Sequence, residues 1–310
     1  MNVLHIGRVK LAGKALLAPM AGYGDIAFRR LCRDYGAALT TTEMISCKGL
    51  LYDNARTVEM LRTAPCETPS CVQLFGGEPE VFAKAAERPE IRRFDIIDIN
   101  MGWPVAKVVR NGEGSALGRD IARAAACAAA AVKHGGGIPV TVKIRLGYGE
   151  NEFTAVSLAR ALESEGVSAV TVHGRTAEQM YRGKADWDKI EQVAAAVSVP
   201  VIGNGDIDNA GTAEYRLKCV SGVMIGRGAL GHPDIFAEIG GGVGDGLRNV
   251  ILRHIDYMLE YFPPRYVAVN MRKHLGWYLH GVPDTKTLKQ ELNRIDDVNE
   301  MRRRIEEALR

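Results

Sequence analysis

The sequence has little net charge and no long apolar run, and each shortage excludes a class of protein. Its 310 residues carry 40 Lys and Arg against 37 Asp and Glu, a net charge of +3 that is too small to indicate a nucleic-acid binder. The longest apolar run, 124–132, is far below the roughly 18 residues of a membrane span. No apolar segment of signal-peptide length opens the chain, so we expect a soluble, cytoplasmic protein.

Cysteine is also scarce, and it is dispersed without a CxxC pair or a Cys/His cluster at zinc spacing. We therefore expect reduced, mostly structural thiols and no metal site. The six cysteines are Cys32, Cys47, Cys66, Cys71, Cys127 and Cys219. Hydrophobic residues make up 46% of the chain and charged residues 25%, which excludes a disordered chain and indicates an enzyme-sized globular fold.

Eight short apolar or β-branched segments alternate with amphipathic segments of helical periodicity. The strand candidates are 15–20, 39–44, 70–76, 96–102, 139–145, 169–175, 200–206 and 222–226. Helix candidates between them include 25–35, 78–88, 153–165 and 187–197. Eight βα units of this total length predict an α/β fold, a (β/α)8 TIM barrel over 1–245, with a doubly wound sheet as the alternative.

Polar and glycine residues gather at the carboxyl end of nearly every strand candidate. This pattern favours the barrel, because all of these ends converge on one mouth, where such enzymes keep their active sites. The residues are Met20 and Gly22, Glu43, Gln73 and Gly76, Asn100 and Gly102, Lys143 and Arg145, His173 and Arg175, Asn204 and Asp206, and Gly226 and Arg227.

From residue 246 the pattern changes to four helix candidates, 247–261, 266–280, 285–295 and 298–309, which predict a small C-terminal helical domain over 246–310. Its 12 Lys and Arg exceed its 9 Asp and Glu by three, so the tail accounts for the whole net charge. Cations and aromatic rings mix here as on an RNA-contacting surface, although a solvated helix face with Trp277 in the core is the alternative. The residues concerned are Arg265, Arg272, Lys273, His274, Trp277 and Tyr278.

Two adjacent loops suit a phosphate group. The segment 223–231 leaves a strand and opens a helix, which exposes backbone N–H groups beside Arg227. The segment 204–207 supplies further amides from the neighbouring loop. In barrels, the loops after strands 7 and 8 are the usual phosphate site.

The other strand ends fit the ring of a flavin mononucleotide (FMN) better than a metal. Lys143 points into the mouth, where a lysine either forms a Schiff base or holds an electron-rich cofactor edge. His173 is suited to hydrogen-bond a ring heteroatom or to act as an acid or base, and Gln73 adds an amide. The segment 18–22 offers small residues and a flexible Met20, so a flat ring can lie close to the backbone.

These motifs together resemble the flavin-dependent tRNA-dihydrouridine synthases. The resemblance covers nearly the whole chain, through APMAGYGDIAFRRLC, TTTEMIS, VQLFGGEPE, IDINMGWP, VTVKIRLG, VTVHGRTAEQMYRGKADW, VIGNGDI, GVMIGRGALGHPDIF and NMRKHLGWYLHG. It implies a barrel that binds FMN and a helical domain that helps to hold RNA through residues such as Arg272, Lys273 and His274. It implies a flavin ring backed by Pro19, Met20 and Ala21, with its polar edge on Gln73, Lys143 and His173, and a phosphate site of Asn204, Gly205, Asp206, Gly226 and Arg227.

The resemblance also implies a reaction. NAD(P)H reduces the flavin, hydride passes to carbon 6 of a uracil that has left its stack, and an acid protonates carbon 5, giving 5,6-dihydrouridine in tRNA or another RNA. Asn100 corresponds to the residue that orients the uracil. The family's acid is a cysteine in an NxGCP-type motif, and the residue at that position here is Trp103. An indole N–H donates hydrogen bonds but is no usable proton donor near neutral pH.

Several interpretations of Trp103 stay open. Another donor has replaced the cysteine, with Cys47, Tyr23, Tyr52 and Lys107 in nearby loops. The scaffold carries altered flavin chemistry, with Trp103 stacking on a planar group. The protein binds flavin and RNA without catalysis, or Trp103 is an engineered change. Outside the RNA enzymes, the alternatives are a flavin barrel acting on a free pyrimidine and a Schiff-base aldolase that uses Lys143.

Overall fold

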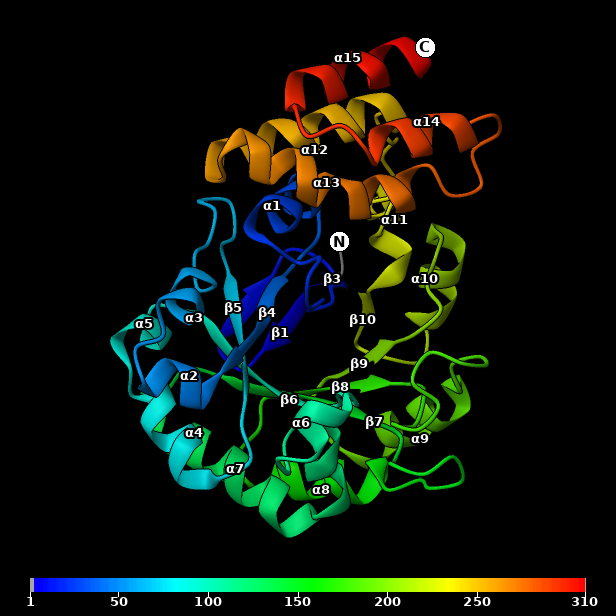
Figure 1. The fold of residues 1–310 in the computed structure, drawn as a ribbon. Coiled ribbons are helices and arrows are strands. Elements are labelled where there is room, and N and C mark those ends of the chain that lie inside the picture. Colours follow the sequence, from blue (N-terminus) through cyan, green and yellow to red (C-terminus); the bar gives the residue numbers. More distant parts are fainter. Residues whose placement is uncertain (1–2, 310) are drawn as a thin grey trace.

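A barrel of eight parallel strands forms the centre of the structure, a computed structural model that describes residues 3–309 (Figure 1). The strands are β3 (Ala15–Leu17), β4 (Thr40–Ser46), β5 (Ser70–Phe75), β6 (Ile96–Met101), β7 (Val140–Arg145), β8 (Ala169–His173), β9 (Val201–Asn204) and β10 (Gly222–Ile225). They pair in the order β3-β10-β9-β8-β7-β6-β5-β4. Hydrogen bonds from Leu17 N to Leu39 O (2.9 Å) and from Ala38 N to Ala15 O (2.8 Å) close the ring. Each strand lies at a predicted position, so the parallel barrel is confirmed over the doubly wound sheet.

Helices follow the strands and surround the barrel. They are α1 (Ile26–Asp34), α2 (Cys47–Leu51), α3 (Ala55–Glu59), α4 (Pro79–Ala86), α5 (Pro89–Arg92), α6 (Ala106–Val109), α7 (Ile121–His134), α8 (Ala155–Ser164), α9 (Trp187–Ala196), α10 (Ala210–Arg216) and α11 (Ile235–Ile239), with 3₁₀ turns η1 (Gly114–Arg119) and η2 (Arg227–Ala229). Side-chain caps start two of the predicted helices, since Asp25 accepts from Phe28 N (3.0 Å) and Asp186 from Lys189 N (3.1 Å).

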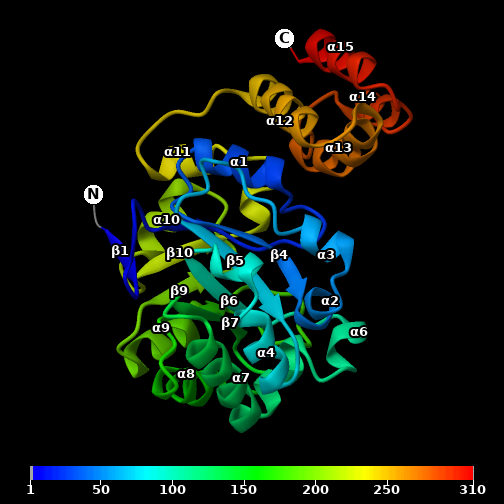
Figure 2. The same cartoon turned by 90° about the vertical axis from the view of Figure 1, so that its left-hand side faces the viewer.

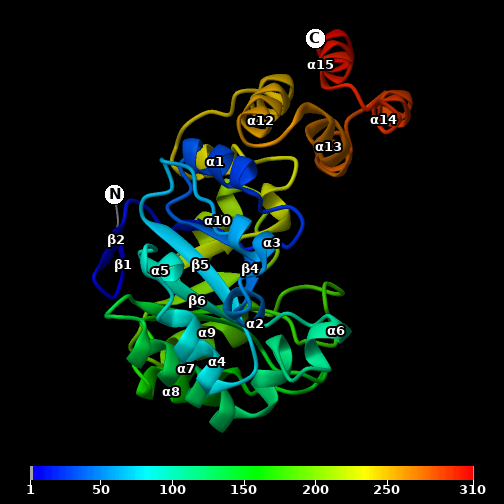
Figure 3. The same cartoon turned by 60° about the vertical axis from the view of Figure 1, so that its left-hand side comes forward.

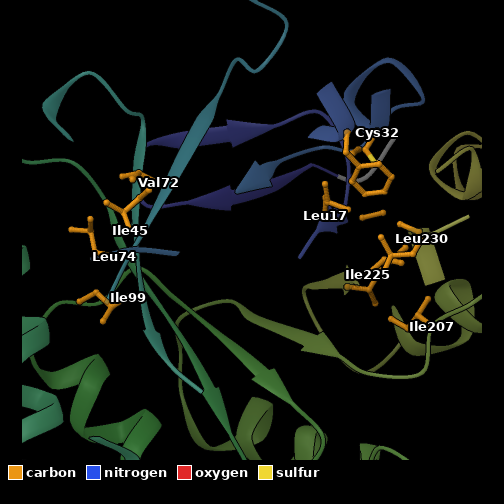
Figure 4. Close-up of a cluster of buried hydrophobic side chains, with 14 of the residues drawn as sticks. Leu17, Cys32, Ile45, Val72, Leu74, Ile99, Ile207, Ile225 and Leu230 are labelled. Atoms are coloured by element: carbon orange, nitrogen blue, oxygen red, sulfur yellow. The ribbon is translucent and has the colours of Figure 1, made fainter. Parts of the chain in front are cut away.

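The strands separate two cores, because successive side chains point to opposite faces. On β6, Ile97, Ile99 and Met101 pack outward against the helices, whereas Ile96 belongs to the cluster inside the barrel. Asp98 therefore also faces inward. Figure 4 shows part of the outer core, including Leu17, Ile45, Val72, Leu74, Ile99, Ile207, Ile225 and Leu230.

An N-terminal hairpin closes the opposite end of the barrel from the predicted mouth. Its antiparallel strands are β1 (Leu4–Ile6) and β2 (Val9–Leu11), seen at the left of Figure 2. The buried side chains of the hairpin pack on apolar residues at the starts of the barrel strands, such as Leu39 and Ile202. The hairpin is absent from the sequence-based prediction. It leaves only the carboxyl end of the barrel for a site.

Four helices follow the barrel, as predicted: α12 (Leu247–Tyr261), α13 (Pro264–Tyr278), α14 (Lys286–Leu292) and α15 (Val298–Ala308). Figure 3 shows α12 above α1, and the Tyr257 hydroxyl donates to the carboxylate of Asp34 (2.6 Å) between these two helices. The Arg30 guanidinium lies 3.9 Å from the centre of the Tyr257 ring. A domain boundary between residues 245 and 246 stays a prediction. Within residues 3–309, no helix is long and apolar enough to span a membrane.

A buried ion pair fixes α1 to the segment before β5. Arg29 Nε donates to Glu67 Oε2 (2.8 Å), and both side chains are 2% exposed. The same guanidinium donates to Gly24 O (2.9 Å) and Arg62 O (2.6 Å), while Glu67 also accepts from the Thr40 hydroxyl (2.7 Å). Removal of either Arg29 or Glu67 would leave the other charge buried without its counter-charge.

Glu67→Ala is expected to lower the free energy of unfolding by about 3–5 kcal/mol, because the buried Arg29 guanidinium loses its counter-charge. Urea unfolding followed by circular dichroism measures the change. The control Arg303→Ala removes an exposed pair with Glu307 (2.6 Å) and should change the free energy by less than about 1 kcal/mol. Equal effects of the two substitutions would contradict the conclusion that the buried Arg29–Glu67 pair stabilises the fold.

Candidate active site

Neighbouring strands bring a chain of hydrogen-bonded polar side chains to the barrel mouth. Gln73 Nε2 donates to Asp98 Oδ2 (2.7 Å), and the Thr141 hydroxyl donates to Asp98 Oδ1 (2.6 Å). Asn100 Nδ2 donates to Gln73 Oε1 (2.9 Å). The strand register places these residues side by side, with Gln73 opposite Asp98 and Asp98 opposite Thr141. Two of the predicted site residues, Gln73 and Asn100, are thus in direct contact.

Asn100 also holds the loop that carries Trp103. Its Oδ1 accepts from the backbone N–H of Gly102 (3.1 Å) and of Trp103 (2.9 Å). The carbonyl of Trp103 accepts from Ser115 N (3.0 Å), and the Trp103 side chain is half-buried. The path of this loop is therefore set by its backbone and by Asn100.

Lys143 lies beside this chain and contacts the next pair of strands. Its Nζ donates to Asn204 Oδ1 (3.0 Å), and Asn204 Nδ2 donates to Met224 O (2.8 Å). Burial and the nearby charge of Arg145 lower the pKa of Lys143 to about 7, while Asp98 opposes the shift. Lys143 therefore exchanges its proton near neutral pH.

His173 is 6% exposed at the end of β8 and is neutral. Burial, with the charges of Lys143, Arg145 and Arg175, holds its pKa well below the usual range. Arg175 Nη1 lies 3.4 Å from His173 Nε2, and because a guanidinium only donates, that nitrogen is the acceptor. Arg175 Nη2 also donates to both carboxylate oxygens of Asp206 (2.8 Å each), which fixes the loop after β9.

The predicted phosphate loops lie next to each other and next to the predicted ring shelf. Gly205 has φ +129°, and a Cβ there would lie 2.6 Å from Ala185 Cβ, so this close turn requires glycine. Arg227 is exposed, and its guanidinium lies 4.7 Å from the centre of the Tyr181 ring and 3.5 Å from Asp206. A Cβ at Gly226 would lie 3.8 Å from Met20 Sδ. The predicted phosphate loops and the predicted ring shelf therefore lie beside each other.

The shelf 19–21 is held by a tight turn. Tyr23 N (3.0 Å) and Gly24 N (2.7 Å) donate to Met20 O, and Gly22 N donates to the carboxylate of Glu43 on β4. Met20 is half-buried and packs against both the outer and the inner apolar cluster.

Three buried charged residues lie at or beneath the mouth. Arg145 and Arg175, predicted from sequence only as polar strand ends without a site role, are 6% and 2% exposed, and Asp98, which the sequence-based prediction does not name, is 4% exposed one layer below them. Arg145 Nε donates to Gly102 O (2.8 Å), and its Nη1 donates to Thr176 O (2.9 Å). The signal in the sequence is a charge within or just after an apolar strand, because a buried charge needs a partner.

The three tail residues predicted to contact RNA lie on α13 in different surroundings. Arg272 and Lys273 are half-buried, with Arg272 Nη2 donating to Ile295 O (2.9 Å) and Lys273 Nζ 5.7 Å from the centre of the Tyr23 ring. His274 is 1% exposed and packs edge-on against Tyr23, with ring centres 5.5 Å apart. The expectation for His274 is therefore corrected: it is a core residue that joins the tail to the shelf loop. RNA contact by the other two stays a prediction.

The alternative proton donors are spread over the structure. Cys47 is fully buried, and burial raises the pKa of its thiol. Tyr52 is 84% exposed at the end of α2, and Lys107 is exposed on α6. Tyr23 is half-buried in the shelf loop. All six cysteines are free thiols, as predicted. Among residues 3–309, no group of three or more His, Cys, Asp or Glu side chains is arranged to hold a metal ion.

A parallel barrel of eight strands with polar side chains at its carboxyl end defines a TIM-barrel fold, with the candidate active site at its mouth. Similar solved folds include histamine dehydrogenase from Rhizobium sp. 4-9 (TM-score 0.60, 12% identity, covering 82% of this chain and 50% of that chain). Another is TcOYE, solved with pHBA (TM-score 0.59, 14% identity, 84% and 98% covered). At these identities the likeness shows the fold alone.

Residues 16–310 match the model of the dihydrouridine synthase (Dus) family, and the chain belongs to this family of flavin-dependent oxidoreductases. It is 38% identical over 308 residues to a probable tRNA-dihydrouridine synthase of Rickettsia bellii, covering 95% of this chain and 94% of the relative. It is 35% identical over 311 residues to tRNA-dihydrouridine synthase B of Pseudomonas aeruginosa, with 96% and 93% covered.

The pKa of Lys143 predicts a pH dependence of stability. Between about pH 7 and pH 10.5 the unfolded chain holds a proton on this lysine that the folded chain has lost, so stability rises with pH across this window. In ligand-free protein, the unfolding free energy of the native chain relative to Lys143→Met should rise by about 1–3 kcal/mol from pH 7 to pH 9. Urea titrations at each pH test this, and a pH-independent difference would contradict it.

Proposed function

We propose that this protein is an FMN-dependent tRNA-dihydrouridine synthase-like oxidoreductase that reduces uridine to 5,6-dihydrouridine in RNA, with NAD(P)H as the electron source. The observation that carries the proposal is the hydrogen bond between Asn100 and Gln73 at the mouth, with Lys143 opposite Asn100 in the strand register, in a chain of the Dus family. The relatives from Rickettsia bellii and Pseudomonas aeruginosa are both described as tRNA-dihydrouridine synthases. A cytoplasmic location belongs to the same proposal.

The residues at the mouth suit FMN in their chemistry. A Cβ at Gly226 would occupy the space beside Met20, at van der Waals distance from Met20 Sδ. Because glycine has no Cβ, this space is open to a group that lies close to the backbone. Arg227 supplies an exposed guanidinium for a phosphate, with the first N–H groups of η2 beside it. Pro19, Met20 and Ala21 would lie behind the ring. When bound, FMN would supply hydride chemistry that no side chain can perform.

The chain's own residues would bind the cofactor and orient the substrate. Lys143 and the neutral His173 would offer one donor and one ring nitrogen to the polar edge of FMN, and Gln73 would add an amide. Asn100 would orient the target uracil, which has to leave its stack to enter the mouth. Half-buried Arg272 and Lys273 on α13 would contact the RNA backbone.

Trp103 supports a second candidate, a Dus-like flavoprotein with altered chemistry or with binding only. Its half-buried indole stands on the loop held by Asn100, and an indole does not deliver a proton near neutral pH. Loss of a general acid typically slows a reaction about 10²- to 10⁴-fold. The two candidates differ in whether flavin reduced by a nicotinamide is reoxidised by RNA.

The purified protein is expected to be yellow, and Arg227→Ala should raise the dissociation constant for FMN about 10- to 100-fold, since a charge-assisted bond is lost. Fluorescence titration of apoprotein with FMN measures the constant. Arg160→Ala, an exposed arginine on α8, is the matched control and should leave it unchanged. Colourless protein that takes up no added FMN would refute the cofactor assignment.

Trp103→Cys is expected to increase uridine reduction on unmodified tRNA by about 10²-fold or more, because it restores a thiol as proton donor. The rate of dihydrouridine formation with excess nicotinamide measures the effect. Trp103→Ala removes the ring without adding a donor, so a gain in that variant would point to steric relief instead. No gain in either variant would favour altered chemistry.

A further inference from the structure

Six buried or half-buried groups form an uninterrupted hydrogen-bonded series from the barrel lumen to the Trp103 loop. The series runs from Thr141 through Asp98, Gln73 and Asn100 to the N–H groups of Gly102 and Trp103. Asp98 is 4% exposed, Gln73 1% and Asn100 7%, so none of them has bulk water as a substitute partner. Each bond in the series depends on the direction of the one before it.

The direction of the series follows from Asp98. An ionised carboxylate only accepts, so Gln73 has to present its NH₂ group to Asp98 and its carbonyl oxygen to Asn100. Asn100 then donates through Nδ2 to that oxygen, which leaves its own Oδ1 for the two loop N–H groups. If Gln73 were turned over, Asn100 would face the loop with a donor, and two N–H groups would lose their acceptor.

The charges around Asp98 agree with this direction. The facing groups are Gln73 and Cys71 on β5 and Thr141 and Lys143 on β7, of which only Lys143 carries a charge near neutral pH. Burial raises the pKa of Asp98 to about 6, and bonds from Gln73 and Thr141 oppose the shift. Near pH 7 and above, the carboxylate is ionised and accepts at both oxygens.

We propose that Asp98 is a positioning residue that fixes the orientation of the Gln73 and Asn100 amides, and through them the loop that carries Trp103. Asp98 itself lies one layer below the mouth and touches neither the proposed cofactor nor the substrate. The structural part of this proposal is independent of the proposed function. Its consequence, that Asp98 orients the amide of Asn100 toward a uracil, rests on the proposed function.

Amide hydrogen exchange tests the structural part in the full chain with FMN added. Asp98→Leu removes the acceptor, and exchange at Gly102 and Trp103 should accelerate roughly fivefold, while the β6 amides of Ile97 and Ile99 stay protected. Asp98→Asn should retain the protection, because its amide oxygen faces Gln73 while the Thr141 hydroxyl turns to accept from its NH₂. Thr171→Val, a buried threonine on β8 outside the series, is the control.

Two outcomes overturn the proposal. Unchanged exchange in Asp98→Leu would show that Asp98 does not position the loop. Loss of protection in both Asp98 variants would show that charge matters and hydrogen-bond direction does not. If Asp98→Leu fails to fold, Gln73→Met breaks the next link and should give the same loop-specific acceleration. Failure of the proposed function would appear separately, as intact exchange effects in protein that reduces no uridine.

Discussion

The register of the parallel strands is the constraint on which the rest of the structure depends. It places Gln73 opposite Asp98, Asp98 opposite Thr141, and Asn100 opposite Lys143. Because side chains alternate between faces, a slip of one residue on β6 would move Asp98 and Asn100 into the apolar layer beneath the helices. It would also move Ile97 and Ile99 into the lumen. The active-site chemistry and the outer core are thus set by the same pairing.

Burial then determines the electrostatics of the mouth. The hairpin β1–β2 closes the amino-terminal end of the barrel with leucine and isoleucine, so the polar layer has water on one side only. In these surroundings the pKa of Lys143 falls to about 7, that of Asp98 rises to about 6, and His173 stays neutral. Near neutral pH the mouth therefore combines an ionised Asp98 and a neutral His173 with a Lys143 that exchanges its proton in this range.

The eight strands and the four tail helices were predictable from sequence, because each carries a regular apolar period and ends at glycine or polar residues. The hairpin was not, because each of its three-residue strands has a polar residue between two apolar ones and so gives no apolar run. The cofactor candidates came from strand ends, whereas Asp98 lies inside an apolar strand, where the sequence shows a charge but not the partners that it binds. His274 was misjudged for a related reason: which face of α13 is buried depends on α1 and the shelf loop.

The backbone of the loop that carries Trp103 is fixed without help from the side chain at this position. The loop is held by backbone groups: Asn100 accepts from the N–H of residues 102 and 103, Arg145 donates to the carbonyl of Gly102, and Ser115 N donates to that of Trp103. None of these bonds uses the side chain at 103. A substitution at residue 103 therefore leaves these backbone bonds and the Asp98–Gln73–Asn100 network with their partners.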